Sequence, residues 1–126
     1  MQGLSGGLSN DIRDIHGAAS KGHAKAQLAL DVFVSEARRW MGGYFVQMNG
    51  ADAIVFTAGI GENRAEMRAA ICANLDQLGI IIDAEKNAAT RATEAVVSTT
   101  NSKVKVMVIP TNEELVVARE AKRLLE

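Results

Sequence analysis

The chain has 126 residues, and its 14 Lys and Arg residues against 15 Asp and Glu residues give a formal net charge of −1. That length fits one domain, and 48% apolar residues with 23% charged residues exclude an intrinsically disordered chain. The balanced charge excludes the basic surface of a nucleic-acid binder, and without about 18 consecutive apolar residues we expect no membrane partner.

The first predicted element is a long helix. Residues 1–22 are rich in Gly and Ser and predict turns with one short capped helix. Over residues 24–48 the apolar side chains recur at helical spacing, which predicts an amphipathic helix. The pair Gly42-Gly43 interrupts this pattern and should weaken or bend the helix, unless another backbone packs closely there. Asn49-Gly50 supplies the left-handed conformations that end the helix.

A strand and a second helix follow. The continuous apolar run of residues 53–57 predicts a strand buried on both faces of a parallel or mixed sheet. After Gly59-Ile60-Gly61 the chain turns into a helix, whose start is predicted by the capping-box spacing of Asn63 and Glu66. Gly79 is the natural end of that helix.

Three further apolar segments complete the predicted sheet. Residues 80–82 and 95–98 are short strand candidates, and the polar residues 83–92 between them form a loop or a short surface helix. Residues 104–109 predict a third strand, which leads into the last helix. We therefore expect an α/β fold, a mixed sheet flanked by helices, with two strand–turn–helix modules that place ligands at strand C-terminal ends.

The first of these turns has two interpretations. Gly59 and Gly61 allow a ligand to approach the backbone, and the following helix presents free N–H groups to a phosphate. The dinucleotide fingerprint is incomplete, because Arg64 stands where a third glycine is needed, and no Walker A lysine follows. From the residues alone the turn is either a nucleotide site or a tight corner between strand and helix.

The second turn offers two adjacent acids. Thr111 and Glu114 have capping-box spacing, which accounts for Glu114. Glu113 has no such local role, and its carboxylate is a candidate for holding Mg²⁺, often through water. The alternative is that both acids interact only with the helix dipole.

The remaining polar candidates are Asp11 with Arg13, the two histidines and the single cysteine. Asp11 and Arg13 form either a solvated local pair or a site in which they contact a ribose and a base. His16 and His23 have no Cys or acid at metal-ligand spacing, so we expect surface histidines. Cys72 is expected to be a buried, unreactive thiol, and one cysteine fits a reducing, cytoplasmic location. No triad or paired-carboxylate pattern is legible, so we predict no catalytic residue.

Three segments of the sequence resemble signatures of the acetate kinase family, which includes propionate and butyrate kinases. These segments are residues 4–15, 53–63 and 108–115. The resemblance implies an actin/Hsp70/sugar-kinase-like (ribonuclease H-like) fold. It also implies reversible, ATP-dependent phosphorylation of acetate, or of another short-chain carboxylate such as propionate, to an acyl phosphate and ADP. ATP/ADP and Mg²⁺ would be the cofactors, and a homodimer the assembly.

The resemblance also assigns site residues. It implies adenosine-side contacts at Asp11, Ile12 and Arg13, a nucleotide-binding turn at Gly59, Ile60, Gly61, Glu62 and Asn63, and a Mg²⁺-site carboxylate at Glu113. One departure lies at Arg64, where the family often has Ser, beside the phosphate-side contacts.

The resemblance covers only about the last third of the family's proteins. We therefore expect residues 1–126 to be the C-terminal nucleotide-binding part, a fragment without the N-terminal domain. In the family, earlier segments hold the carboxylate and stabilise the transferring phosphoryl group, so the chain alone should be inactive. The alternatives are a stand-alone nucleotide-binding or assembly module without catalysis, and a non-binding scaffold. The stripe of Trp40 and Tyr44 predicts self-association, unless it is internal core.

Overall fold

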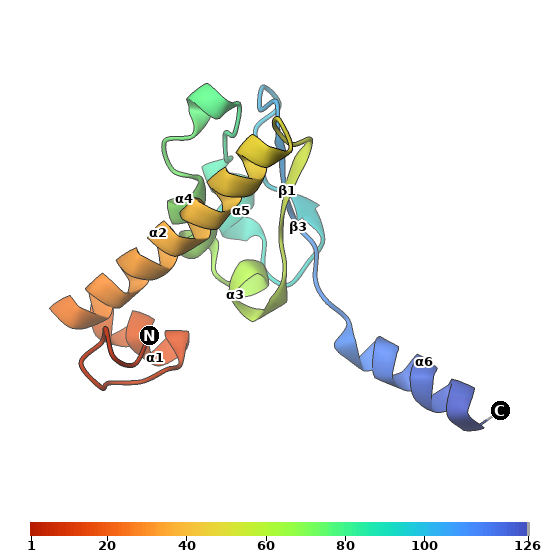
Figure 1. Ribbon diagram of the computed structural model, residues 1–126, viewed down its shortest axis with the longest axis horizontal. Coiled ribbons are helices and arrows are strands. Elements are labelled where there is room, and N and C mark those ends of the chain that lie inside the picture. Colours follow the sequence, from red (N-terminus) through yellow and green to blue (C-terminus); the bar gives the residue numbers. More distant parts are fainter. Residues whose placement is uncertain (126) are drawn as a thin grey trace. The chain divides into compact units, whose positions relative to one another are not determined.

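A computed structural model of the chain describes residues 1–125, apart from the side chain of Glu113 (Figure 1). The chain forms two compact units, Met1–Ala51 and Asp52–Glu126, and each is described by itself. Within the described residues, no helix combines the length and apolar character needed to cross a membrane.

The first unit is a pair of helices, α1 (Ile12–Ala19) and α2 (Ala24–Gln47), which pack against each other. Its buried apolar side chains are Ile15 on α1 and Ala26, Ala29 and Leu30 on α2. The predicted short and long helices are thus confirmed.

The glycine pair does not end α2, and the close backbone packing considered as the alternative is not found among the described residues. The helix continues through Gly42 and Gly43, and no described atom lies within 4 Å of a Cβ built on either residue. A glycine costs a helix interior only about 1 kcal/mol, which the hydrogen bonds of a long helix can absorb. The predicted end is confirmed, because Asn49 and Gly50 have φ values of 58° and 106°.

The second unit contains a three-stranded mixed sheet with the order β1-β3-β2 (Figure 1). Strand β1 (Ala53–Phe56) is parallel to β3 (Lys105–Val108), and β2 (Ala95–Val96) is antiparallel to β3. The central strand β3 buries Val106 and Val108 completely. The prediction that the first strand is buried on both faces is wrong, because β1 is an edge strand and Val55 is 47% exposed.

The helix expected after the first turn is divided into shorter pieces. They are α3 (Ala58–Asn63), α4 (Ala65–Cys72) and the 3₁₀ turn η1 (Asp76–Leu78). The break falls at Arg64, whose φ of −119° and ψ of 85° are not helical. The predicted cap is wrong, because the Asn63 side chain donates back to the Gly59 carbonyl at 3.0 Å.

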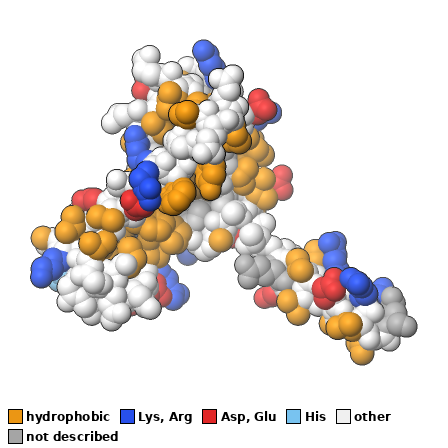
Figure 2. Space-filling model, in the orientation of Figure 1, with side chains coloured by type: hydrophobic (Ala, Val, Ile, Leu, Met, Phe, Trp, Pro, Cys, Tyr) orange, Lys and Arg blue, Asp and Glu red, His pale blue; other side chains and the backbone are white. Residues whose placement is uncertain are grey.

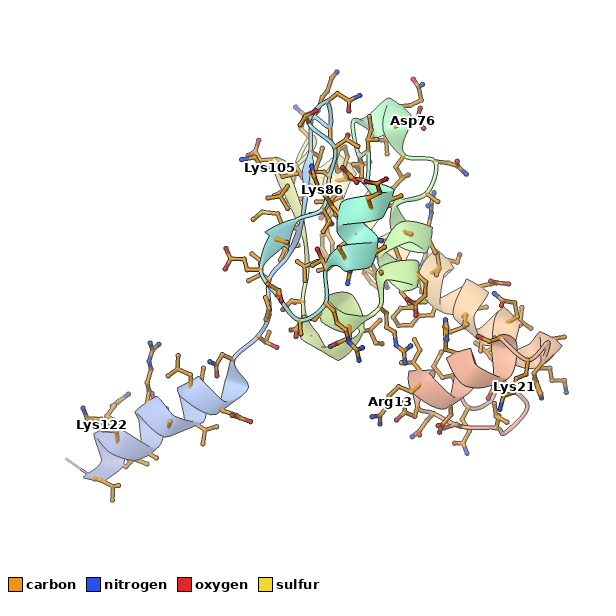
Figure 3. All side chains as sticks on the ribbon, turned by 180° about the vertical axis from the view of Figure 1, so that it is seen from behind. Arg13, Lys21, Asp76, Lys86, Lys105 and Lys122 are labelled. Atoms are coloured by element: carbon orange, nitrogen blue, oxygen red, sulfur yellow. The ribbon has the colours of Figure 1, made fainter. Side chains whose placement is uncertain are left out.

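The segment between the turn and β3 holds one helix and one isolated bridge. Helix α5 (Ala84–Ala89) carries Lys86, which is labelled in Figure 3. The helix is capped by Asp83, whose carboxylate accepts from two backbone N–H groups. Residues 80–82 form no strand; among the described residues, Ile82 makes a single bridge to Ser98. The polar segment is therefore a short surface helix, one of the two structures expected.

A fully buried arginine, Arg68 on α4, connects three segments of this unit. Its Nη1 donates to the carbonyls of Gly61 and Glu62, at 2.8 and 3.1 Å. Its Nε donates to the Asn87 side chain at 2.7 Å, and its Nη2 to the carbonyls of Asn87 and Thr90 at 2.9 and 2.8 Å. Burial lowers the pKa of Arg68, while the charge of Glu66 opposes that shift. The hydrogen bonds of Arg68 therefore hold the end of α3 close to α5.

The last helix, α6 (Glu113–Leu125), exposes apolar side chains together with Lys and Arg residues (Figure 2). The exposed apolar residues, between 42% and 88% accessible, are Leu115, Val116, Val117, Leu124 and Leu125.

Replacing Arg68 should destabilise the second unit. Arg68→Met leaves buried carbonyl oxygens without a donor, which costs about 1–3 kcal/mol for each group. We expect the free energy of unfolding to fall by about 3 kcal/mol or more in urea denaturation followed by circular dichroism. The control is Arg39→Met, because Arg39 pairs with Glu36 on the surface, where solvent screens the pair and its loss should change stability far less. Equal effects of the two substitutions would contradict this account.

Two Gly→Ala substitutions should change stability in opposite directions. Gly79 has a φ of 76°, and a Cβ there would lie 2.8 Å from the Cβ of Lys103. Gly79→Ala should destabilise the chain by about 1–2 kcal/mol. Gly42→Ala, in an open helical position, should stabilise it by about 0.5–1 kcal/mol. Thermal unfolding measures both, and a shift of the same sign in the two variants would refute the assignment.

Candidate functional site

The two turns predicted as ligand sites lie at one edge of the sheet. Strands β1 and β3 are parallel neighbours, and Phe56 pairs with Val108, so the segments that follow them emerge side by side. The Ile109 N–H continues the pairing by donating to the Phe56 carbonyl at 3.0 Å. Between these segments lies a hollow of about 580 Å³. Its lining residues are Ala58, Gly59, Thr111, Asn112 and Glu114.

The two glycines of the first turn have different surroundings. No described atom lies within 4 Å of a Cβ built on Gly59, which lines the hollow. A Cβ on Gly61 would lie 3.1 Å from the carbonyl carbon of Phe56, closer than ordinary contact. Gly61 is therefore needed for the tight corner between strand and helix, and Gly59 leaves its backbone accessible to a ligand. The tight-corner interpretation therefore holds for Gly61, and the nucleotide-site interpretation stays a prediction for Gly59.

The backbone at the start of α3 is strained. Ala58 has a φ of 59°, a left-handed conformation that costs a non-glycine residue about 1–2 kcal/mol. The preceding Thr57 makes no side-chain capping bond. Strain of this kind persists where the surrounding structure enforces it, and it is often found at binding sites.

Glu62, assigned to the nucleotide site by resemblance, points its carboxylate at the protein itself. Its Oε1 accepts from the Thr111 N–H at 2.8 Å and from the Thr111 hydroxyl at 3.0 Å, and the side chain is buried. These bonds, the backbone N–H of Thr111 first, lower the pKa of Glu62, together with a bond from the Ala58 N–H; burial opposes them. Because folding lowers this pKa, the stabilisation is present above the unfolded pKa and is lost as pH falls through the folded one.

The start of α6 differs from the predicted capping box. Asn112 is the capping residue, since its side-chain oxygen accepts from the Leu115 N–H at 2.9 Å. The Thr111 hydroxyl donates to Glu62 instead, so the capping role proposed for Glu114 is wrong. Glu114 is exposed and lines the hollow. The side chain of Glu113, the predicted Mg²⁺ ligand, lies outside what the structure describes.

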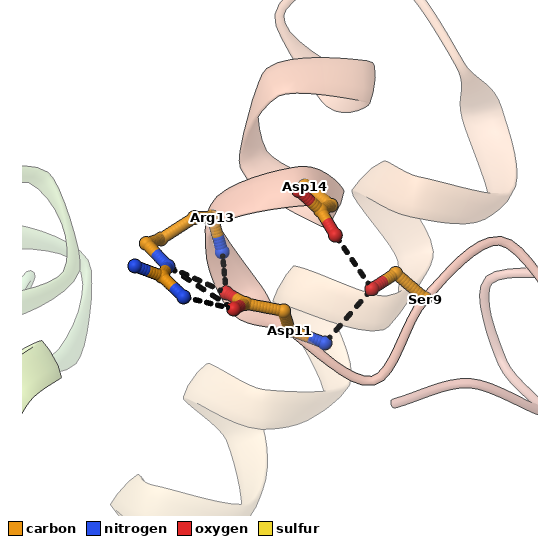
Figure 4. A network of polar contacts seen from close by, with 4 residues as sticks. All are labelled: Ser9, Asp11, Arg13 and Asp14. Atoms are coloured by element: carbon orange, nitrogen blue, oxygen red, sulfur yellow. Dashed lines mark hydrogen bonds and ion pairs between the residues drawn. The ribbon is translucent and has the colours of Figure 1, made fainter.

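The candidates near the N-terminus belong to the unit Met1–Ala51 (Figures 3 and 4). Asp11 caps α1 by accepting from the Arg13 N–H at 2.8 Å, and it also accepts from the Arg13 Nε at 3.0 Å. The hydrogen bonds that Arg13 donates to the Asp11 carboxylate raise the pKa of Arg13, whose side chain is 76% exposed. The solvated local pair is therefore present. Ile12, the third candidate, is half-buried.

The two histidines differ in exposure, because His16 is half-buried where a surface residue was expected. His23 is exposed and caps α2 by accepting from the Ala26 N–H at 3.2 Å. Cys72 is buried. Among the described residues, no three metal-ligating side chains come together. Trp40 and Tyr44 are more than half exposed, so the internal-core interpretation of this stripe is wrong.

Sequence reasoning missed Arg68 and the pairing of Glu62 with Thr111. Arg68 lies between the core residues Met67 and Ile71 on α4. An arginine in a helix usually indicates an exposed face, so the sequence contained no sign that this one is buried. The sequence also contained no signal for the hydrogen bonds between Glu62 and Thr111, since these residues are 49 positions apart.

Comparison with known proteins gives consistent matches. The sequence model of the Acetokinase family matches residues 1–119. The acetate kinase of Methanosarcina thermophila is 55% identical over 120 residues, which cover 95% of this chain and 29% of that protein. This chain therefore spans less than a third of the length of that relative.

Solved structures agree with the sequence comparison. The crystal structure of Porphyromonas gingivalis acetate kinase matches with a TM-score of 0.87 and 36% identity, covering 99% of this chain and 31% of that chain. A propionate kinase from Francisella tularensis matches with a TM-score of 0.80 and 39% identity, covering 94% and 29%. These neighbours confirm the predicted α/β fold of the actin/Hsp70/sugar-kinase type. With the family model matching nearly its whole length, this chain belongs to the acetokinase family.

Proposed function

We propose that this chain is the nucleotide-binding part of a kinase that reversibly phosphorylates acetate, or another short-chain carboxylate such as propionate, at the expense of ATP. The observation that carries the proposal is the hollow between the two strand ends, where Gly59 leaves the backbone open. Membership of the acetokinase family supplies the class of reaction.

The residues around the hollow suit a nucleotide phosphate and a magnesium ion. Gly59 has no Cβ and open space around it, so its backbone could receive a phosphate oxygen, and Ile60 is the next proposed contact. Mg²⁺ prefers oxygen ligands, and Glu114 contributes a carboxylate to the hollow. Glu113 is the proposed metal ligand. Bound Mg²⁺ would supply charge neutralisation for the phosphates, while Gly61, Glu62 and Asn63 hold the turn in shape.

Asp11, Ile12 and Arg13 are the proposed adenosine-side contacts. The Asp11 carboxylate already accepts from the Arg13 side chain at 3.0 Å, and Arg13 is exposed. An exposed pair of this kind contributes little to stability, so little is lost if a ribose hydroxyl and a base replace its contacts.

We propose that the carboxylate substrate is bound, and the transferring phosphoryl group stabilised, by residues in the part of the relatives that this chain does not cover. We propose a homodimer in the cytoplasm, in keeping with the exposed Trp40 and Tyr44. The alternative is a nucleotide-binding or assembly module without catalysis. A reading frame that continues upstream into the rest of a kinase would support the kinase. A natural start at Met1 would support the module without catalysis.

The 126-residue chain should bind nucleotide but should not catalyse the formation of acyl phosphate. Isothermal titration calorimetry with ATP or ADP in the presence of Mg²⁺ should show binding, and chelation of the metal should weaken it. With acetate added, trapping of acyl phosphate by hydroxylamine should give no product, because in-line transfer relies on charges supplied elsewhere. Absence of nucleotide binding would favour the non-binding scaffold, and turnover at a kinase rate would refute the inactivity.

Two glycine variants should separate binding from stability. Gly59→Ala directs a methyl group into open space, so the melting temperature should stay within a few degrees while ATP affinity falls. Gly61→Ala presses against the Phe56 backbone and should lower the melting temperature itself. Calorimetric titration and thermal unfolding of both variants test this assignment. If Gly59→Ala binds ATP as the parent chain does, the phosphates do not lie at Gly59.

A further inference from the structure

The carboxylate of Glu62 joins the two turns that form the hollow. One of its oxygens accepts from both the backbone N–H and the hydroxyl of Thr111, at 2.8 and 3.0 Å. The Ala58 N–H helps, more weakly than Thr111, to lower the pKa of the same carboxylate. Ala58 and Thr111 are themselves lining residues of the hollow, so Glu62 lies directly behind its wall.

The position of Glu62 is itself fixed from the other side. Its backbone carbonyl accepts from the buried Arg68 at 3.1 Å, and the neighbouring Gly61 carbonyl does so at 2.8 Å. The side chain is therefore held at its base by α4 and at its tip by the segment after β3. A displacement of the first turn would be transmitted to Thr111, and the reverse also holds.

The bonds of Glu62 fall where the backbone needs support. Thr111, which donates both bonds, directly precedes Asn112, the cap of α6. Ala58, on the other side, has the unfavourable φ of 59°. The buried Glu62 carboxylate accepts from the protein, and its negative charge would repel a nucleotide phosphate.

We infer that Glu62 is a positioning residue, which couples the phosphate-binding turn at Gly59 to the magnesium side of the site at the start of α6. This inference rests on the proposed function, and it gives Glu62 a role other than contact with nucleotide. Binding of phosphates at one turn and of the metal at the other then favour each other, because both require the same arrangement of Ala58 and Thr111.

The test compares nucleotide affinity with and without magnesium. For the 126-residue chain, ADP is titrated in excess Mg²⁺ and again in chelator, and the ratio of the two dissociation constants is the coupling. Glu62→Gln keeps an accepting oxygen but removes the charge, and we expect the ratio to shrink by about 5-fold or more. Thr111→Val removes only the hydroxyl bond and should give an intermediate ratio, which Thr111→Ser should restore. Glu85→Gln, the same change at an exposed position, should leave the ratio unaltered.

A second measurement needs no nucleotide. Hydrogen exchange of the Thr111 amide should be faster in Glu62→Gln than in the parent chain, while the amides of β3 exchange as before. Equal loss of affinity with and without Mg²⁺ would overturn the coupling, and unchanged Thr111 exchange would overturn the positioning role. If the parent chain binds no ADP, the proposed function is wrong, and so is the proposed coupling between nucleotide and magnesium binding. Hydrogen exchange still decides whether Glu62 holds Thr111.

Discussion

The buried guanidinium of Arg68 is the constraint on which the geometry of the second unit depends. Its described acceptors are neutral oxygens at the end of α3 and in α5 and the residue after it. Removing a charge from water costs several kcal/mol, and a full set of short hydrogen bonds offsets that cost. The carbonyls of Gly61 and Glu62 also lie at the negative end of α3, where a cation is favoured. The position of the first turn thus follows from a side chain that never reaches the hollow.

The sequence was sufficient to predict the framework of the site. Apolar runs identified the two parallel strands, and turn residues placed the candidate site at their ends. The capping predictions at Asn63 and Thr111 failed because a short polar side chain has several possible partners, and its actual partner is known only after folding. Asn63 donates to the carbonyl of Gly59, four residues away. The carboxylate that Thr111 contacts is 49 residues away, beyond any local pattern.

The structure adds a packing role to two residues of the first turn. The residues alone left Gly59 and Gly61 as either a nucleotide site or a tight corner, and the Phe56 backbone explains Gly61 by packing. Resemblance implies that Glu62 belongs to the nucleotide-binding turn, and one of its carboxylate oxygens accepts from Thr111. Membership of a sequence motif therefore identifies residues that act together. It does not distinguish those that contact a ligand from those that hold the contacting backbone in place.

The aromatic residues of this chain are divided unevenly between its two units. The single Trp and the single Tyr, Trp40 and Tyr44, both lie on α2, with ring centroids 6.3 Å apart. The unit Asp52–Glu126 has Phe56 as its aromatic side chain. Intrinsic fluorescence of the natural sequence consequently reports on Met1–Ala51 alone. Emission and backbone signals recorded on one sample will therefore reveal whether the two units unfold together or in succession.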